Sequence, residues 1–83
     1  MQVDQVITLA NGNNYGLLLD SVLNNNKYFL AVLLKDGEEP TNTFKVFKER
    51  HENGEVLVDE EKDPVILNQL LEDYYLQADN LDD

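Results

Sequence analysis

The feature that most constrains the fold is a run of seven apolar residues, YFLAVLL, at positions 28–34. Successive side chains of a β-strand point to opposite faces of the sheet, so this run places apolar groups on both faces. The segment YGLLLDSVL at 15–23 is similar. A strand with one solvated face alternates apolar and polar residues. We therefore expect both segments to be covered on both sides.

Turn sequences divide the chain up to residue 58 into pieces of strand length. These are NGNN at 11–14, NNNK at 24–27, DGEEPTN at 36–42 and ENGE at 52–55. Asn, Asp and Gly accept the backbone geometry of tight hairpins. Short loops between consecutive strands are typical of an antiparallel meander. The predicted strands are at about 5–10, 15–23, 28–35, 43–51 and 55–58.

The pattern changes after residue 58. Asp63 is a favourable helix N-cap and Pro64 suits the first helical position. Apolar residues then recur at helical spacings of three and four: Ile66, Leu67, Leu70, Leu71, Tyr74 and Tyr75. We predict a helix at 64–77 and a frayed acidic tail at 78–83. The chain is thus expected to form a single domain over residues 1–83.

The predicted fold class is α+β, with an antiparallel five-stranded β-meander followed by one C-terminal α-helix. A helix of this length extends about 20 Å and cannot cover both sheet faces. Two arrangements solve the problem. The sheet can curl into a barrel-like form, with one face filling its interior. Alternatively, another chain can cover the second face.

The net charge of −11 limits the possible partners. Residues 59–83 contain nine acids and one base, a net of −8, and residues 1–58 contain eight acids and five bases, a net of −3. Such a surface repels nucleic acid and anionic lipid, so we expect no direct nucleic-acid partner and no membrane partner. No cysteine or signal sequence is visible, and the expected location is the cytoplasm.

A basic stretch nevertheless occurs within residues 41–56. Lys45, Lys48 and Arg50 are three of the six basic residues, and His51 is the single histidine. We interpret this charged half of the fourth strand as a solvated end whose bases pair with neighbouring glutamates. The alternatives are a local positive patch at a partner surface or a phosphate site, and the overall negative charge opposes the latter.

No arrangement of residues indicates catalysis. Ser21 is the only serine and lies within a predicted strand, not on a nucleophile elbow. The sequence offers no nucleophile and orienting group that would make His51 a catalytic base. It also contains no glycine-rich phosphate-binding motif. The acids at 59–63 lack the spacing of a calcium loop and fit a helix cap. We predict a protein that is not an enzyme, with no catalytic residues, cofactor or metal.

The remaining hypothesis is a protein–protein interaction module that uses an apolar sheet face and the acidic helix pole. Its partner would be another protein or a second copy of the chain. The candidate contact residues are Phe29, Leu33, Phe47, Tyr75, Lys48 and Arg50. The alternative is a nucleic-acid mimic that inhibits or regulates a DNA- or RNA-binding protein. Its phosphate-like track would be the carboxylates at 59–63, 72–73 and 79–83.

The strand sequences resemble those of the YrzB-like family of small acidic proteins from Gram-positive bacteria. NKYFLAVLL and FKVFKE stand where that family commonly has a G-K-E-Y-A-V-L-L strand and a V-x-R/K-V-x-E strand. The likeness extends over nearly the whole chain, although the loop after the third strand has fewer acids here. The resemblance implies a cytosolic bacterial protein and supplies no catalytic residues to carry over.

Overall fold

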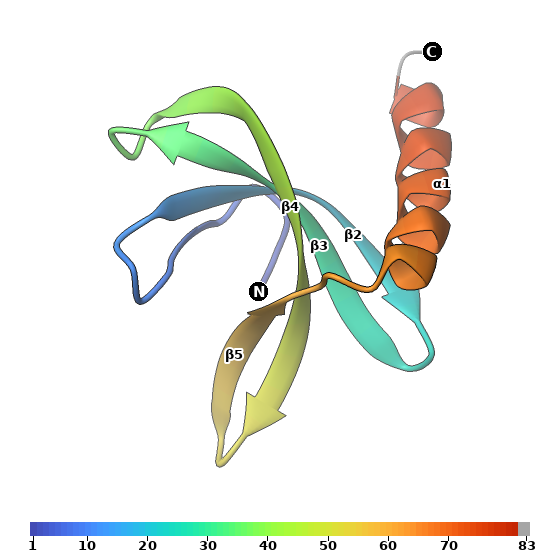
Figure 1. Ribbon diagram of the computed structural model, residues 1–83, viewed down its shortest axis with the longest axis horizontal. Helices are drawn as coiled ribbons and strands as arrows, with labels where there is room; N and C mark the ends of the chain where they lie inside the picture. Colours follow the sequence, from blue (N-terminus) through green and yellow to red (C-terminus); the bar gives the residue numbers. More distant parts are fainter. Residues whose placement is uncertain (82–83) are drawn as a thin grey trace.

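The computed structural model describes residues 1–81 (Figure 1). Five antiparallel strands form one sheet that curls into a half-barrel, and one helix follows, as the α+β prediction requires. The sheet order β1-β2-β3-β4-β5 matches the order along the chain, which confirms the meander. The elements are β1 (Val6–Thr8), β2 (Asn14–Leu23), β3 (Asn26–Lys35), β4 (Glu39–Glu52), β5 (Glu55–Glu60) and α1 (Pro64–Leu81).

Three tight hairpins set the order of the strands from β2 to β5. Each turns at two consecutive residues with positive φ, a conformation that Asn, Asp and Gly adopt at low cost. The three pairs are Asn24–Asn25, Asp36–Gly37 and Asn53–Gly54. Turn chemistry therefore accounts for the meander before any tertiary contact is considered.

The β3–β4 connection is tighter than its sequence suggested. Positions 36–42 were expected to form one polar loop, yet β4 already begins at Glu39. The turn at Asp36–Gly37 is sufficient, so Lys35 pairs with Glu39 and Leu34 with Pro40. The register shifts between Val32 and Leu34, and again in the β2–β3 ladder between Leu17 and Leu19. Such irregularities bend and twist strands, which favours the curl.

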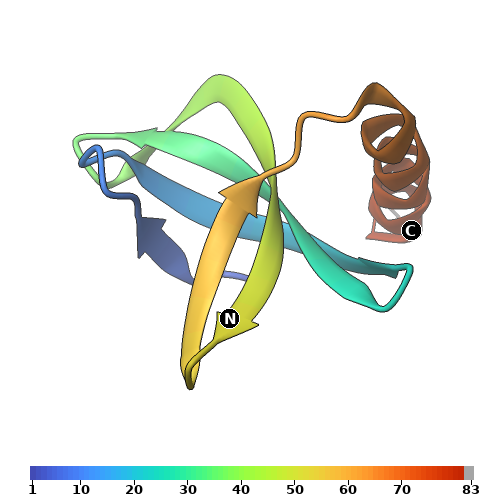
Figure 2. The same ribbon diagram turned by 60° about the horizontal axis from the view of Figure 1, so that its bottom comes forward.

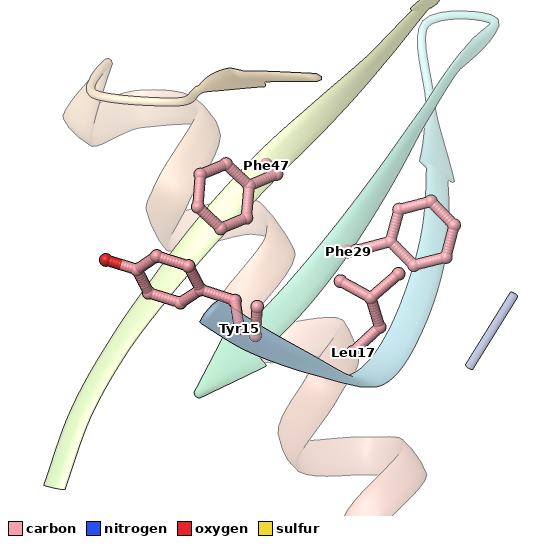
Figure 3. Packing of buried hydrophobic residues seen from close by; sticks show 5 residues of the cluster. Tyr15, Leu17, Phe29 and Phe47 are labelled. Atoms are coloured by element: carbon pink, nitrogen blue, oxygen red, sulfur yellow. The ribbon is translucent and has the colours of Figure 1, made fainter. Parts of the chain in front are cut away.

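The concave side of the sheet holds the larger hydrophobic core, the interior cluster, shown in Figure 3. Its members are Tyr15, Leu17, Phe29, Ala31 and Phe47, each exposed by 2% or less. The rings of Tyr15 and Phe47 meet edge to face, with centroids 5.1 Å apart. Of the two arrangements open to the sequence, the sheet has the first: it curls and covers this face itself.

The convex side carries a second core beneath α1, the outer cluster. Tyr28 and Val46 from the sheet pack against Leu70 and Tyr74 from the helix. The helix begins as expected, because the Asp63 Oδ1 atom accepts a hydrogen bond of 2.9 Å from the Val65 amide.

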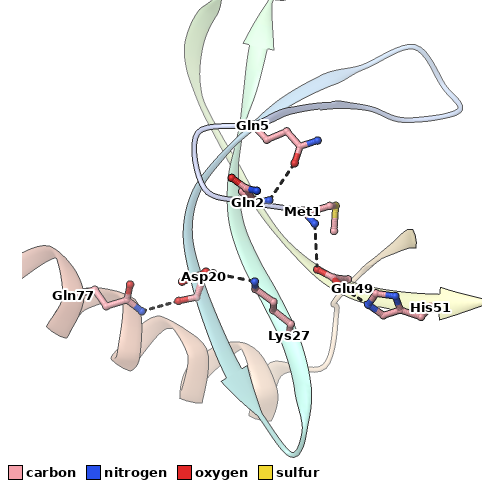
Figure 4. Close-up of polar contacts among 8 residues, drawn as sticks. All are labelled: Met1, Gln2, Gln5, Asp20, Lys27, Glu49, His51 and Gln77. Carbon is pink, nitrogen blue, oxygen red and sulfur yellow. Dashed lines mark hydrogen bonds and ion pairs between the residues drawn. The ribbon is translucent and has the colours of Figure 1, made fainter. Parts of the chain in front are cut away.

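Polar bonds fix the other half of the helix against β2. The Ser21 hydroxyl donates to Asp73 Oδ2 at 2.5 Å. The side-chain amide of Gln77 donates to the main-chain carbonyl of Asp20 at 2.8 Å (Figure 4) and also to Asp73 Oδ2 at 3.0 Å. These bonds join the helix to β2, which precedes β3, β4 and β5 and is therefore far from the helix in sequence.

Several other elements end elsewhere than the sequence predicts. β5 continues to Glu60 instead of 58, so Asp59 and Glu60 belong to the sheet and not to the expected helix cap. The helix continues to Leu81, past residue 77, because neither Gly nor Pro follows to stop it. Residues 78–81 of the expected tail are therefore helical, and 82–83 lie outside the described residues. β1 is shorter than 5–10, because the chain turns after it and the Leu9 amide donates to the Asn13 carbonyl.

Two glycines provide a matched test of the turn argument. Gly54 has φ of +80°, and a Cβ there would touch nothing, whereas a Cβ on Gly16 would make ordinary contacts with Leu34 and Val32. We expect Gly54→Ala to destabilise the fold by about 1 kcal/mol through backbone strain alone. Gly16→Ala should be neutral or stabilising by about 0.5 kcal/mol.

Urea unfolding of the two variants and of the wild type measures both changes. Equal stability of Gly54→Ala and the wild type would contradict the assigned turn.

Candidate interaction site

The helix leaves part of the convex sheet face open. Beside it Phe44 is 56% exposed, and Tyr75 on the helix is 71% exposed. A hollow of about 300 Å³ lies between them, which we call the outer groove. Its walls are almost entirely apolar: Leu19, Leu30, Phe44, Leu71, Tyr74, Tyr75 and Ala78. The groove thus joins residues of three strands and one helix face into a single apolar surface.

The outer groove continues toward a charged rim. An adjoining hollow of about 290 Å³ shares Leu30, Phe44 and Leu71 but is also lined by Glu60 and Glu61. Lys45 on this rim lies 2.9 Å from Glu60, and their hydrogen bond raises the pKa of the lysine. The bond neutralises Glu60 in part. Glu61, which has no ion pair among the residues that the structure describes, therefore supplies the negative charge of the rim.

Tyr74 brings a buried hydroxyl to the wall of the groove. The residue is 3% exposed, and its Oη atom has no hydrogen-bond partner among the described residues. Burial, followed by the nearby carboxylate of Asp73, raises the pKa of this phenol well above its usual value. The side chain therefore acts as an apolar packing group whose polar atom is not satisfied.

The basic end of β4 is largely compensated within the chain. The Arg50 guanidinium binds Asp59 at 2.8 Å and also contacts Glu52. His51 Nε2 lies 2.6 Å from Glu49 Oε1 (Figure 4). Pairing with Glu52 was expected, whereas Asp59 is contributed by β5, directly across from Lys48. Lys48 itself has no ion pair among the residues described.

Lys48, Glu49, Arg50 and His51 line a polar hollow of about 380 Å³. Asn25, Asn26 and Lys27 from the β2–β3 hairpin complete its lining. Lys27 lies 3.8 Å from Asp20 and 5.2 Å from the centroid of the Phe29 ring. Since most of its bases already have acidic partners, this hollow offers little net positive charge.

The six predicted contact residues occupy three different environments. Phe29 and Phe47 are 0% and 1% exposed inside the interior cluster, and Leu33 packs partly buried against that cluster. Lys48 and Arg50 line the polar hollow. Tyr75 alone lies at the outer groove.

Sequence reasoning missed Phe44 and Leu71 as surface residues. Phe44 shares a sheet face with Val46, which the helix buries, so alternation alone gave both the same environment. Leu71 belongs to the apolar stripe of the helix. The position of the helix is what distinguishes Phe44 from Val46, because α1 packs over Val46 and leaves Phe44 beyond its edge.

Other kinds of site are not seen in residues 1–81. No group of three or more His, Cys, Asp or Glu side chains there is placed to hold a metal ion. In the same part of the chain, no helix combines the length and the apolar character that crossing a membrane requires.

No family model, curated protein or solved structure matches this chain. The resemblance to the YrzB-like family therefore stays a prediction.

The buried hydroxyl of Tyr74 leads to a prediction about stability and pH. Removing an unsatisfied buried hydroxyl should stabilise the fold, so we expect Tyr74→Phe to gain about 1 kcal/mol at pH 7. In the unfolded chain the phenol ionises near its ordinary pKa of 10.0, whereas the raised pKa keeps it protonated in the fold. The wild type must therefore lose stability as the pH rises above 10, and Tyr74→Phe should lose less.

Urea unfolding at pH 7 and above pH 10 checks both effects. Tyr75→Phe is the control, because Tyr75 is largely exposed and the change should be neutral. A clear loss of stability in Tyr74→Phe at pH 7 would mean that the hydroxyl has a hydrogen-bond partner.

Proposed function

We propose that this protein is a non-enzymatic protein–protein interaction module whose contact surface is the outer groove. The observation that carries the proposal is the exposure of Phe44 beside Leu71 and Tyr75, in one hollow of about 300 Å³. The shape and apolar lining suit an inserted apolar side chain of a partner.

The clustering of these residues separates the groove from the ordinary protein surface. Single exposed apolar residues are common and need no explanation. Here three large ones come together from two elements, and contiguous apolar surface of this kind marks interaction sites. Aromatic residues in such a position also supply a large share of binding energy at protein interfaces.

The charge of the surroundings favours a basic partner. The protein carries a net charge of −11, and Glu61 lies on the rim of the groove. Complementary charge accelerates association and excludes wrong partners more than it adds affinity. A partner segment with an apolar anchor flanked by Lys or Arg fits this surface, and its association should slow as salt is added.

A nucleic-acid mimic remains the alternative. It requires a continuous track of free carboxylates. Asp59 is bound to Arg50, and Glu60 is bound to Lys45, so the part of the track at residues 59–60 is partly neutralised within the chain. We therefore place this function second to the groove-based module.

The experiment compares three baits in the cytosol of the source organism: the wild type, a Phe44→Ser/Tyr75→Ser variant and a Val65→Ser control. Val65 is 64% exposed on the same helix and outside the groove. A partner counts only if the wild type and the control retain it and the groove variant does not. Titration of that purified partner should then show about 30-fold weaker binding to the groove variant, the effect of losing about 2 kcal/mol.

Two results would overturn the proposal. One is a partner that binds all three proteins equally. The other is a wild-type protein that stays strictly monomeric in light scattering and recovers no partner that depends on the groove. A groove-independent partner that is itself a DNA- or RNA-binding protein, released by nucleic acid, would favour the mimic.

A further inference from the structure

The half-barrel is open between its two edge strands. β1 and β5 are the ends of the sheet, and no described strand lies between them (Figure 2). Both strands line one hollow of about 720 Å³, which we call the seam. The lining consists of Met1, residues 5–10, Arg50 and residues 56–58.

The main chain of β5 has groups that face the seam and have no partner strand among the described residues. In an antiparallel ladder, hydrogen-bonded and non-hydrogen-bonded residue pairs alternate. The Glu61 amide donates to the Val46 carbonyl, and the register continues through Lys48–Asp59 to Arg50–Leu57. Val56 and Val58 therefore belong to the non-bonded pairs. Their N–H and C=O groups point away from β4.

The same argument applies to β1. The Leu17 amide donates to the Gln5 carbonyl, and the Leu9 amide donates to the Asn13 carbonyl. Ile7, two residues from each, is the intervening bonded position opposite Tyr15. Val6 and Thr8 then direct their N–H and C=O groups away from β2. Each side of the seam thus presents a strand edge ready for pairing.

The directions of the two edges determine what can close the gap. Consecutive strands alternate in direction because every ladder is antiparallel, so β1 and β5 run the same way. Direct pairing between them would be parallel. A single added strand that runs opposite to both would instead complete an all-antiparallel barrel of six strands.

The interior cluster itself is buried, but residues that border it remain partly exposed at the seam. Five partly buried residues pack against that cluster, and four of them also line the seam: Met1, Ile7, Leu9 and Val58. The fifth, Leu33, does not. Apolar side chains on an added strand would therefore continue the existing core.

We propose that the seam binds one extended segment of a basic partner polypeptide, antiparallel to both β1 and β5, with apolar residues alternating with Lys or Arg. Apolar residues would face the interior cluster, and basic residues would face outward near Glu55, which precedes the lining residue Val56 and has no ion pair among the residues described. Arg50 in the lining does not oppose them strongly, because it is bound to Asp59 and Glu52. A second copy of the chain is the less favourable occupant, because two chains of charge −11 repel each other.

This inference gives the proposed interaction function a second surface and a binding mode, strand addition. It does not depend on the outer groove. The test therefore uses a defined probe, a synthetic peptide of about nine alternating Lys and Val residues, long enough to span the edge strands.

The main readout is amide hydrogen exchange followed by NMR. In the free protein the amides of Val6, Thr8, Val56 and Val58 should exchange rapidly, whereas those of Leu57 and Asp59 should be protected. The peptide should slow exchange of the first set at least tenfold and leave the second set unchanged. A peptide with N-methyl groups on alternate residues should not bind, because it cannot pair along both edges.

Substitutions separate strand pairing from other binding. Val56→Pro removes an amide that β4 does not use, so the fold should persist while peptide affinity falls at least tenfold. Leu57→Pro is the matched control for the alternation, because it removes a ladder bond and should destabilise the sheet. Phe44→Ser should bind the peptide like the wild type, so failure at the groove and failure at the seam can be distinguished.

Four results would overturn the proposal. The methylated peptide could bind as well as the parent peptide, or a Glu and Val peptide could bind as well as the Lys and Val peptide. Val56→Pro could fold and keep full affinity. Finally, the seam amides could be protected without peptide in proportion to protein concentration, which would place a second copy in the seam.

Discussion

Tyr15 and Phe47 meet edge to face on the concave side of the sheet, beside the fully buried Phe29. A flat five-stranded sheet would leave these side chains in water, because the single helix lies on the other face. Curling brings β2, β3 and β4 around them and removes the need for a second layer. Each buried aromatic side chain contributes about 2–3 kcal/mol relative to exposure, which is a large share of the stability of a small domain. The shape of the sheet, the position of the helix and the open edges follow from this burial.

A sheet that fills its own concave face still has a convex face to cover. The helix covers the part formed by Tyr28 and Val46 and is fixed to β2 by the bonds of Asp73 and Gln77. Its eighteen residues cannot extend over the whole convex surface. The apolar residues beyond its edge, Phe44 above all, are therefore a consequence of chain length and helix placement. The sheet also has five strands, whereas a closed barrel in which every neighbouring pair is antiparallel requires an even number of strands.

Local chemistry explains most of what could be predicted from the sequence. Asn-Asn, Asp-Gly and Asn-Gly pairs mark the three hairpin turns, and the all-apolar run at 28–34 reveals a strand buried on both faces. Alternation correctly groups Phe29 with Ala31 and Leu33 on one face. It does not reveal which face becomes concave, because the two faces of this strand are equally apolar. Phe29 and Phe47 were for that reason candidate contacts, although the curl buries them. The sequence also predicts a long loop after Lys35, because the polar residues at 38–42 resemble loop sequence when the strand register is unknown, whereas β4 begins at Glu39.

The bonds between helix and β2 have a consequence for the order of folding. Ladder partners in the sheet are separated by at most 20 residues, as in Tyr28–Lys48. The Ser21–Asp73 bond closes 52 residues and the Gln77–Asp20 bond closes 57. The entropic cost of closing a loop grows with its length. The hairpins should therefore form before the contact between the helix and β2. We expect α1 to dock last and to detach first, and native-state hydrogen exchange would register this as a lower opening free energy in α1 than in β3. The half-barrel would then form first and persist longest, and the helix could detach from it while the sheet stays folded.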